Sequence, residues 1–133
     1  DLISKVFVWT RLHTYYVQYV FNHLYMKGGS VITDSDVNNL FHQILTDFEP
    51  QFINYRNLLP SHQFRLLKAI AVEDGISQPT SGNFISSNDL TSASSVSTSL
   101  KALADKEMIV FDRDKWQVYD VFLSRWLEYH YKD

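Results

Sequence analysis

Residues 91–120 read TSASSVSTSLKALADKEMIVFDRDKWQVYD, and this stretch decides the fold of the chain. Its first half carries an apolar stripe at helical spacing, formed by Val96, Leu100, Leu103 and Ala104. Most of the polar residues of this segment lie outside the stripe, namely Ser92, Ser95, Ser97, Ser99, Lys101 and Lys106. Thr91 or Ser92 can cap this segment, because a short side-chain oxygen reaches the N–H groups two or three residues further on. This half is therefore predicted to form a capped amphipathic helix.

The second half of the stretch predicts a β-hairpin. Residues 108–111 (MIVF) and 116–119 (WQVY) are β-rich runs, and residues 112–115 (DRDK) are the predicted four-residue loop between them. A helix followed directly by such a hairpin is typical of a winged helix-turn-helix.

The composition limits the classes of protein to consider. With 133 residues, 45% apolar and 15% aromatic, the chain suits one globular domain or two small ones. A net charge of −3 gives no general attraction to nucleic acid or an anionic membrane, and the lack of Cys fits a reducing compartment. Because no apolar run is long enough to span a bilayer, we expect a cytoplasmic protein without a membrane partner. The start at Asp-Leu-Ile-Ser rather than Met predicts a piece of a longer protein.

The N-terminal part is expected to form a helical cluster. Residues 2–9 resemble the last turns of a helix, and residues 10–14 (TRLHT) interrupt the pattern. Residues 13–26 are apolar almost all round, which is typical of a helix buried in the middle of a cluster. Residues 27–30 (KGGS) are expected to end that helix through glycine.

Further helices complete the predicted fold. One begins at Thr33 or Asp34, and Pro50 is expected to divide it from the helical segment that follows. The helices of the winged part are expected from Pro60 to Gly75, at residues 81–88 and 92–106, and after Asp120. The predicted fold class is mainly α with a small β-hairpin. A helical, lid-like bundle at residues 1–58 would precede a winged helix-turn-helix domain at residues 59–133.

The sequence offers no pattern for covalent chemistry. It lacks the glycine-rich run with Lys and Ser/Thr that cradles phosphates in a P-loop. Its five histidines show no spacing that would set two of them on one helical face beside a carboxylate, as a zinc site needs. No nucleophile-elbow pattern is present either. We therefore expect no catalytic residue, metal site or cofactor in this chain.

A nucleic-acid interface is the alternative to a protein interface. The candidate contacts are hydroxyls and cations of the predicted helix and hairpin: Ser94, Ser95, Ser97, Thr98, Lys101, Arg113 and Lys115. From residue 59 onward, however, acidic side chains outnumber basic ones. Phosphate neutralisation supplies much of the affinity for DNA, so this is a poor electrostatic basis for binding. A winged domain that faces a protein is the favoured interpretation.

Two segments carry a family resemblance. The matching residues of the winged part are Gln63, Ser94-Ser95-Val96, Leu100, Leu103, Tyr119-Asp120-Val121-Phe122 and Trp126-Leu127. This part resembles the C-terminal winged-helix region of prokaryotic AAA+/STAND-type ATPases of the archaeal-ATPase group. Upstream, TRLHTYYVQYVFNHLY is similar to the T-x-G-H-P-x-Y-x-Q-x-L segment of the helical lid in that group. Leu12 and Thr14 stand where the lid pattern has Gly and Pro, and Val121 replaces the Pro after Asp120.

The resemblance implies a parent protein with an N-terminal P-loop core that binds ATP and magnesium. In that parent, Arg11, His13 and Thr14 would lie nearest the nucleotide; alternatively, they form a helix cap with an exposed Arg. The chain would be a non-catalytic C-terminal part whose winged domain is a nucleotide-coupled interaction module. Its partners would be its own ATPase core and another protein. The alternatives are a free-standing winged-helix regulator that binds DNA, and a structural interaction module whose aromatic N-terminal helices bury a partner surface.

Overall fold

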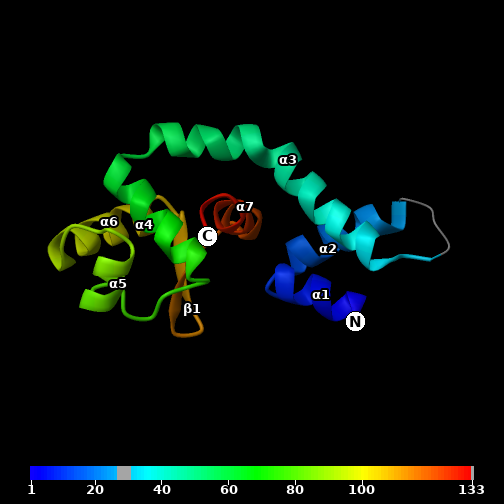
Figure 1. Cartoon of the computed structure of the whole chain (residues 1–133), viewed down its shortest axis with the longest axis horizontal. Coiled ribbons are helices and arrows are strands. Elements are labelled where there is room, and N and C mark those ends of the chain that lie inside the picture. The colour runs from blue at the N-terminus through cyan, green and yellow to red at the C-terminus, as the bar shows by residue number, and fades with distance from the viewer. Residues whose placement is uncertain (27–30, 133) are drawn as a thin grey trace. The chain divides into compact units, whose positions relative to one another are not determined.

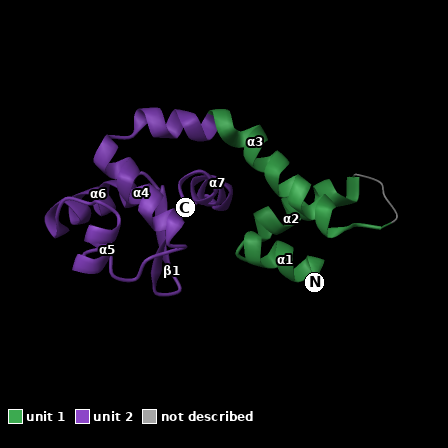
Figure 2. Cartoon of the chain, in the orientation of Figure 1, with its two compact units in different colours: residues 1–50 green, residues 51–133 purple. Residues whose placement is uncertain are grey.

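The computed structural model describes residues 1–26 and 31–132, and the chain divides into two compact units, residues 1–50 and 51–133 (Figure 1, Figure 2). The predicted fold class is confirmed, since helices are followed by one small hairpin and a last helix. The first unit ends at residue 50, whereas the predicted subdomain division lies at residue 58. Between them, Phe52 is buried, and its ring centroid lies 5.6 Å from that of Trp126. This stretch therefore packs with the second unit.

The first unit contains α1 (Leu2–Trp9), α2 (Thr14–Met26) and most of α3 (Asp34–Leu58). Trp9 of α1 stacks on Phe41 of α3, with ring centroids 4.0 Å apart and planes 6° apart. The buried apolar residues of this unit are Val6, Val20, Leu24, Val37, Leu40, Phe41, Ile44 and Leu45. The small core is thus built from one stripe of each helix.

The turn between α1 and α2 interrupts the helical pattern, as predicted. Its hydrogen bonds run from the Arg11 N–H to the Val8 carbonyl at 3.2 Å and from the Leu12 N–H to the Phe7 carbonyl at 3.0 Å. This is the Schellman arrangement, which satisfies carbonyls that the last turn of a helix leaves free. Arg11 and Leu12 both have positive φ, of 53° and 59°. A side chain there crowds the following carbonyl, so the turn is strained.

Helix α2 is not buried all round, and the prediction that it lies in the middle of a cluster is wrong. Only Val20 and Leu24 are buried, while Tyr15, Tyr25 and Met26 are 62%, 87% and 79% exposed. The neighbouring helices cover one side of α2, where Phe21 also contacts Phe7, and Tyr15, Tyr25 and Met26 stay exposed on the rest. The glycine end predicted at residues 27–30 lies outside the described residues.

Helix α3 begins as predicted, with Thr33 as its cap. The Asp36 N–H donates to Thr33 Oγ1 at 3.2 Å, and the Thr33 N–H donates to Asp36 Oδ2 at 2.9 Å. This reciprocal pair is a capping box. The predicted division at Pro50 is wrong, because α3 continues through it to Leu58. A proline inside a helix removes one backbone donor, and the regular hydrogen bonds on either side are sufficient here to keep the backbone helical.

The second unit contains α4 (Ser61–Val72), α5 (Gly82–Ser87), α6 (Ala93–Asp105) and α7 (Val121–Tyr131), with the hairpin between α6 and α7. Helix α4 packs on α6, on α7 and on the second strand of the hairpin. Short side-chain oxygens cap three of the helices: Ser81 accepts from the Phe84 N–H, Ser92 from the Ser95 N–H and Asp120 from the Leu123 N–H, at 3.1 to 3.2 Å. The caps at Ser92 and Asp120 agree with the predictions, whereas Ser81 was expected only as the start of its helix.

The hairpin is tighter than predicted. Strand β1 (Ile109–Asp112) pairs with β2 (Lys115–Val118), and Asp112 lies opposite Lys115. The loop therefore has two residues, Arg113 and Asp114, instead of four, and both have positive φ. A two-residue turn with positive φ at both positions matches the right-handed twist of the strands, so no longer loop is needed to connect them. Ile76 adds a bridge on the other edge of β2, with hydrogen bonds of 2.8 and 3.0 Å to Trp116.

Helix α4 ends at Val72, and the turn after it contains Gly75, where the stop was predicted, and has the same hydrogen bonds as the end of α1. The Asp74 N–H donates to Ala71 at 3.0 Å, and the Gly75 N–H donates to Ile70 at 2.9 Å. The φ of Gly75 is 98°, and a Cβ added there would lie 2.4 Å from Gln117 Nε2. The glycine therefore serves both the turn and the close approach of β2.

None of the helices within the described residues has the length and apolar character that crossing a bilayer requires.

Candidate functional site

The outer face of α6 presents four of the predicted contact residues together. Ser94, Ser97, Thr98 and Lys101 are exposed and recur every three or four residues, so they share one face of the helix. Thr98 Oγ1 donates to the Ser94 carbonyl at 3.1 Å. Lys101 Nζ lies 3.4 Å from Asp105 Oδ2, and both side chains are well exposed. The one cation of this face therefore has an acidic neighbour, which reduces its attraction for phosphate.

The hairpin turn presents the other two predicted contacts. Arg113 and Lys115 are exposed, and they alternate along the chain with the exposed Asp112 and Asp114. Next to the turn, Phe111 is 53% exposed, and its ring centroid lies 5.3 Å from that of Trp116. The tip thus combines balanced charge with an apolar flank, which suits a protein surface better than a polyanion.

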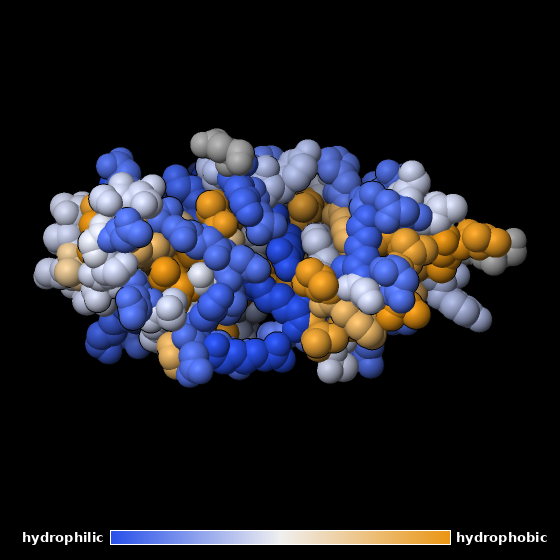
Figure 3. All heavy atoms as spheres, turned by 60° about the horizontal axis from the view of Figure 1, so that its bottom comes forward, coloured by the Kyte–Doolittle hydropathy of each residue, from blue (hydrophilic) through white to orange (hydrophobic). Residues whose placement is uncertain are grey.

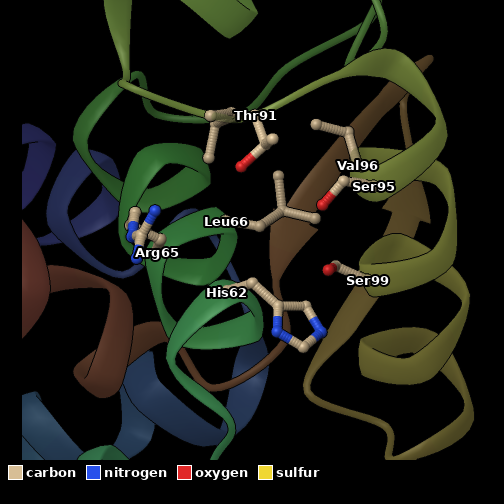
Figure 4. A pocket seen from close by; sticks show the side chains of 8 residues that line it. His62, Arg65, Leu66, Thr91, Ser95, Val96 and Ser99 are labelled. Atoms are coloured by element: carbon tan, nitrogen blue, oxygen red, sulfur yellow. The ribbon is translucent and has the colours of Figure 1, made fainter.

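Ser95 lies apart from the other predicted contacts and lines a pocket between α4 and α6 (Figure 4). Helix α4 contributes His62, Arg65 and Leu66, and the segment that leads into α6 contributes Leu90 and Thr91. From α6 itself come Ser95, Val96 and Ser99. The pocket is small, with room for about one water molecule. In Figure 4 the hydroxyls of Thr91, Ser95 and Ser99 gather around the Leu66 and His62 side chains.

The prediction that Ser99 lies on the polar side of α6 is wrong. Ser99 is 2% exposed, and its Oγ is buried without a hydrogen-bond partner. Three and seven residues separate Val96 from Ser99 and Leu103, so all three share the face that packs inward. The polar character of serine suggested the outer side, whereas the spacing places it inside.

The pocket has a positive character. His62 and Arg65 line it, and none of its lining residues is acidic. It also lies at the first turns of α6, where unpaired N–H groups and the helix dipole favour negative charge. The lining of the pocket thus contains one guanidinium, one imidazole, three hydroxyls and the N-terminal turn of α6.

The turn between α1 and α2 brings Arg11, His13 and Thr14 together in one short segment. Arg11 is half-buried, and the His13 ring centroid lies 6.2 Å from that of Tyr16. Thr14 is the first residue of α2 and is exposed. Their proximity to a nucleotide in a parent protein stays a prediction. Over residues 1–26 and 31–132, no group of three or more His, Asp and Glu side chains is arranged to hold a metal ion.

An apolar surface covers much of the first unit. Figure 3 shows hydrophobic side chains gathered at the right of the visible face, over this unit. Its large exposed apolar residues are Ile3, Phe7, Val8, Leu12, Tyr15, Tyr25, Met26, Val31 and Ile32. We call these residues the N-terminal apolar surface. Contiguous apolar area of this kind is typical of surfaces that bind another protein.

Comparison with protein families identifies the second unit. A family model described as a probable winged helix domain matches residues 50–129. The chain belongs to this family. Neither a curated protein nor a solved structure matches the chain. Within the winged helix domain, α4, α5 and α6 are the three helices, and the β1–β2 hairpin is the wing.

The winged helix domain contains the candidate contacts on α6 and the wing, but not residues 11–14. Sequence reasoning missed its pocket, to which His62, Arg65, Thr91 and Ser99 contribute. Two signals were available: His62 and Arg65 are three residues apart on α4, and Ser99 falls on the inward stripe of α6. What the sequence does not reveal is that these two faces meet.

Proposed function

We propose that this chain is the non-catalytic C-terminal part of an ATP-binding protein of the AAA+/STAND type. In this proposal the winged helix domain is an interaction module whose position follows the nucleotide state. The N-terminal apolar surface packs on the protein's own ATP-binding core, which holds ATP and magnesium. A further protein binds the winged helix domain.

The N-terminal apolar surface is the observation that carries the proposal. Val8, Tyr25 and Met26 are 73%, 87% and 79% exposed, although the composition of their helices is that of buried ones. Removing apolar area from water contributes about 25 cal/mol per Å², so covering several such side chains gives a strong drive to associate. A core that precedes these helices in the same chain is the partner available at the highest effective concentration.

The residues that depart from the ATPase pattern support the same proposal. Leu12 stands where that pattern has Gly, and its φ of 59° is one that glycine adopts without strain. Thr14 and Val121 stand where the pattern has Pro, and each is the first residue of its helix. Proline is favoured at that position because its missing N–H has no partner in the helix anyway. The backbone thus suits the family's residues at the places where this sequence lacks them.

The proposed mechanism is mechanical. A change of nucleotide in the core alters its contacts with residues 10–14 and with the N-terminal apolar surface. The helices of the first unit then shift, and the winged helix domain moves toward or away from its partner. Exchange of ATP for ADP drives this motion only if the core binds the two nucleotides with different relative affinities in the two positions of the winged helix domain.

Hydrogen exchange on the complete natural gene product tests the proposal. The coding sequence upstream of Asp1 should contain a P-loop and an acidic strand end. With ATP and magnesium, peptides covering α1 and α2 should change their protection, whereas peptides from the interior of the winged helix domain should not. A natural product without a P-loop, or equal protection of α1 and α2 with and without nucleotide, would overturn the proposal.

A matched pair of variants separates the apolar surface from general effects. Val8→Ser removes an apolar side chain that is 73% exposed, and we expect faster exchange in α1 and α2 of the complete protein. Tyr119→Ser removes one that is 56% exposed in the winged helix domain, and should leave α1 and α2 unchanged. Equal effects of the two variants would count against a core-binding surface.

A titration with duplex DNA distinguishes the alternative regulator function. Fluorescence anisotropy at ~50 mM salt, where phosphate contacts are strong, should give no binding by the isolated chain if the winged helix domain faces a protein. Tight binding with a steep salt dependence would favour the DNA-binding alternative instead.

A further inference from the structure

We propose that the winged helix domain binds an acidic segment of a partner protein beside the C-terminal end of α7. The residues that form this surface are Arg56 at the end of α3, Arg65 and Lys68 on α4, and Tyr131 at the end of α7. We call these four residues the basic surface. The proposal rests on that part of the proposed function in which a further protein binds this domain, and it does not need an ATP-binding core.

The charge of the chain is unevenly distributed, and the basic surface lies where acidic residues are missing. Between Glu49 and Glu73 the sequence contains three Arg and Lys side chains and no Asp or Glu, although the whole chain has a net charge of −3. This stretch includes the last turns of α3 and all of α4. The two helices therefore carry a local positive charge on a domain that is acidic elsewhere.

Tyr131 brings cations from two different helices together. Arg56 Nη1 donates to the Tyr131 hydroxyl at 3.3 Å, and Lys68 Nζ lies 5.1 Å from the centroid of the Tyr131 ring. The second distance is that of a cation–π contact. The ring of Phe64 also packs edge-on against Tyr131, with centroids 5.9 Å apart. The end of α7 thus joins residues that are distant in the sequence into one surface.

Arg65 extends this surface along α4. It lies three residues before Lys68, so the two side chains are neighbours on the helix. In Figure 4 the Arg65 side chain lies on the far side of Leu66 from the hydroxyls of Ser95 and Ser99. Its guanidinium is therefore turned away from those hydroxyls, and it adds a third cation to the basic surface.

The cations of the basic surface lack the acidic partners that other cations of the domain have. Lys101 and Arg125 each pair with a carboxylate of their own helix, at 3.4 and 3.2 Å. Among the residues that the structure describes, no carboxylate forms an ion pair with any of the three cations of the basic surface. Carboxylates of a partner would supply the missing negative charge, and the planar fork of an Arg can hold both oxygens of one carboxylate.

A short protein segment fits this surface better than a nucleic acid does. The phosphates of a nucleic acid continue beyond any three cations, and from residue 73 onward acidic side chains outnumber basic ones. A short acidic segment meets only the basic surface. The half-buried rings of Phe64 and Tyr131 also offer apolar contact, which is typical of protein interfaces. We therefore expect a segment in which acidic and apolar residues alternate.

Fluorescence anisotropy with the whole chain and a short labelled peptide, in which Glu alternates with Leu, tests the proposal. The reference peptide has Gln in place of every Glu, so it keeps the length and loses the charge. We expect saturable binding of the acidic peptide that weakens with salt, and no binding of the reference. Arg56→Gln and Arg65→Gln should each weaken binding about threefold, and Lys68→Glu by at least about tenfold, because it turns attraction into repulsion.

Two variants elsewhere in the domain are matched controls. Lys101→Glu makes the same charge change on α6 as Lys68→Glu makes on α4, and Arg113→Gln matches Arg65→Gln; both controls should bind the peptide like the unaltered chain. In ¹⁵N spectra the peptide should shift amides of α4 and the end of α7. A Lys68→Glu variant with an unchanged melting temperature and unchanged peptide affinity would overturn the proposal, as would shifts confined to α6 and the wing.

An oligothymidylate with the same charge as the acidic peptide separates protein from nucleic acid. It should bind more weakly than the peptide, and tighter binding would overturn the proposal in favour of a nucleic-acid surface. Equal binding of the Glu and Gln peptides would also refute it, because charge would then have no part. These measurements use residues 1–133 alone, so they can fail while the nucleotide-dependent exchange of α1 and α2 in the complete protein is observed, and the reverse.

Discussion

The two units of the chain differ in how they treat their apolar side chains. In the winged helix domain, seven consecutive residues of α7, from Val121 to Leu127, are buried, and few large apolar residues are exposed. The first unit is smaller, yet it carries most of the large exposed apolar residues, including Val8, Tyr25 and Met26. The winged helix domain buries its apolar side chains in its own core, whereas the first unit has an apolar surface that another domain or protein can cover. Composition alone does not distinguish the two.

The same contrast appears where α1 and α4 end. Both helices finish with the same pair of hydrogen bonds and with two successive residues at positive φ. In α4 the second of these residues is Gly75, which adopts the conformation freely. In α1 it is Leu12, for which the conformation costs about 1–2 kcal/mol. One turn is relaxed and the other strained, although their geometry is alike.

The largest expected effect comes from the core of the winged helix domain. Leu103 is completely buried, so Leu103→Ala should lower the free energy of unfolding by about 2–5 kcal/mol through lost burial and a cavity. Urea unfolding followed by segment-resolved hydrogen exchange should show the loss in α4, α6 and α7 but not in α1 and α2. Lys101→Ala, on the exposed face of α6, is the control and should change stability by less than about 0.5 kcal/mol. Equal loss in both units would contradict their separate cores.

The relaxed helix end can be strained by adding one methyl group. Gly75→Ala places a Cβ at a φ of 98°, close to the Gln117 side chain, which donates to the Asp74 carbonyl at 3.3 Å. We expect a loss of about 2 kcal/mol in the free energy of unfolding, measured by thermal or urea denaturation. Gly82→Ala is the matched control, because a Cβ there meets no atom within 4 Å. A similar loss in both variants would show that local space at Gly75 is unimportant.

The strained helix end can be relaxed by the reverse change. Leu12→Gly removes the steric cost of positive φ, and Leu12 is 57% exposed, so little burial is lost. After the entropy cost of glycine, we expect a net gain of about 0.5–1 kcal/mol in the stability of the first unit. Ile3→Gly, inside α1 and 55% exposed, should instead lose about 1 kcal/mol. If both variants are destabilised, the turn is not strained.

The smallest effect concerns an ion pair of the first unit. Lys5 Nζ lies 2.8 Å from Asp34 Oδ1, and this hydrogen bond holds the pKa of Asp34 below its ordinary value. A carboxyl with a lowered folded-state pKa stabilises the fold above its unfolded-state pKa, and this stability is lost as the pH falls through the folded-state pKa. Asp34→Asn should therefore flatten the acid limb of the stability curve of α1 and α3, because it slightly lowers stability at neutral pH and leaves stability below the folded-state pKa unchanged. An unchanged acid limb would mean that the pair contributes nothing.

The parts of the fold that depend on short-range hydrogen bonds were predictable. Thr33, Ser92 and Asp120 begin helices because their side-chain oxygens reach amides within the same turn. Gly75 ends one because it alone takes the required conformation cheaply. The inward stripe of α6 followed from the spacing of Val96 and Leu103.

The wrong predictions concern features that depend on tertiary contacts or on conflicting local preferences. Tyr25 and Met26 belong to an apolar helix, but whether they are buried depends on which helices or domains pack around it. Arg113 and Asp114 lack the Asn-Gly signal of a two-residue turn, and pairing of the strands imposes that turn on them. The pocket beside Ser99 forms where α4 packs on α6, and no local sequence pattern predicts that packing.

The bridge between Ile76 and Trp116 also gives the winged helix domain a mechanical property. Two backbone hydrogen bonds tie the segment after α4 to β2, and the Gln117 side chain adds a third link to the Asp74 carbonyl. A load applied at the wing by a bound partner would reach the end of α4 through these three links in parallel. Trp116 is only one residue pair from the turn, so the wing is tied to the end of α4 close to its tip, and a pull on the tip should reach that helix end directly.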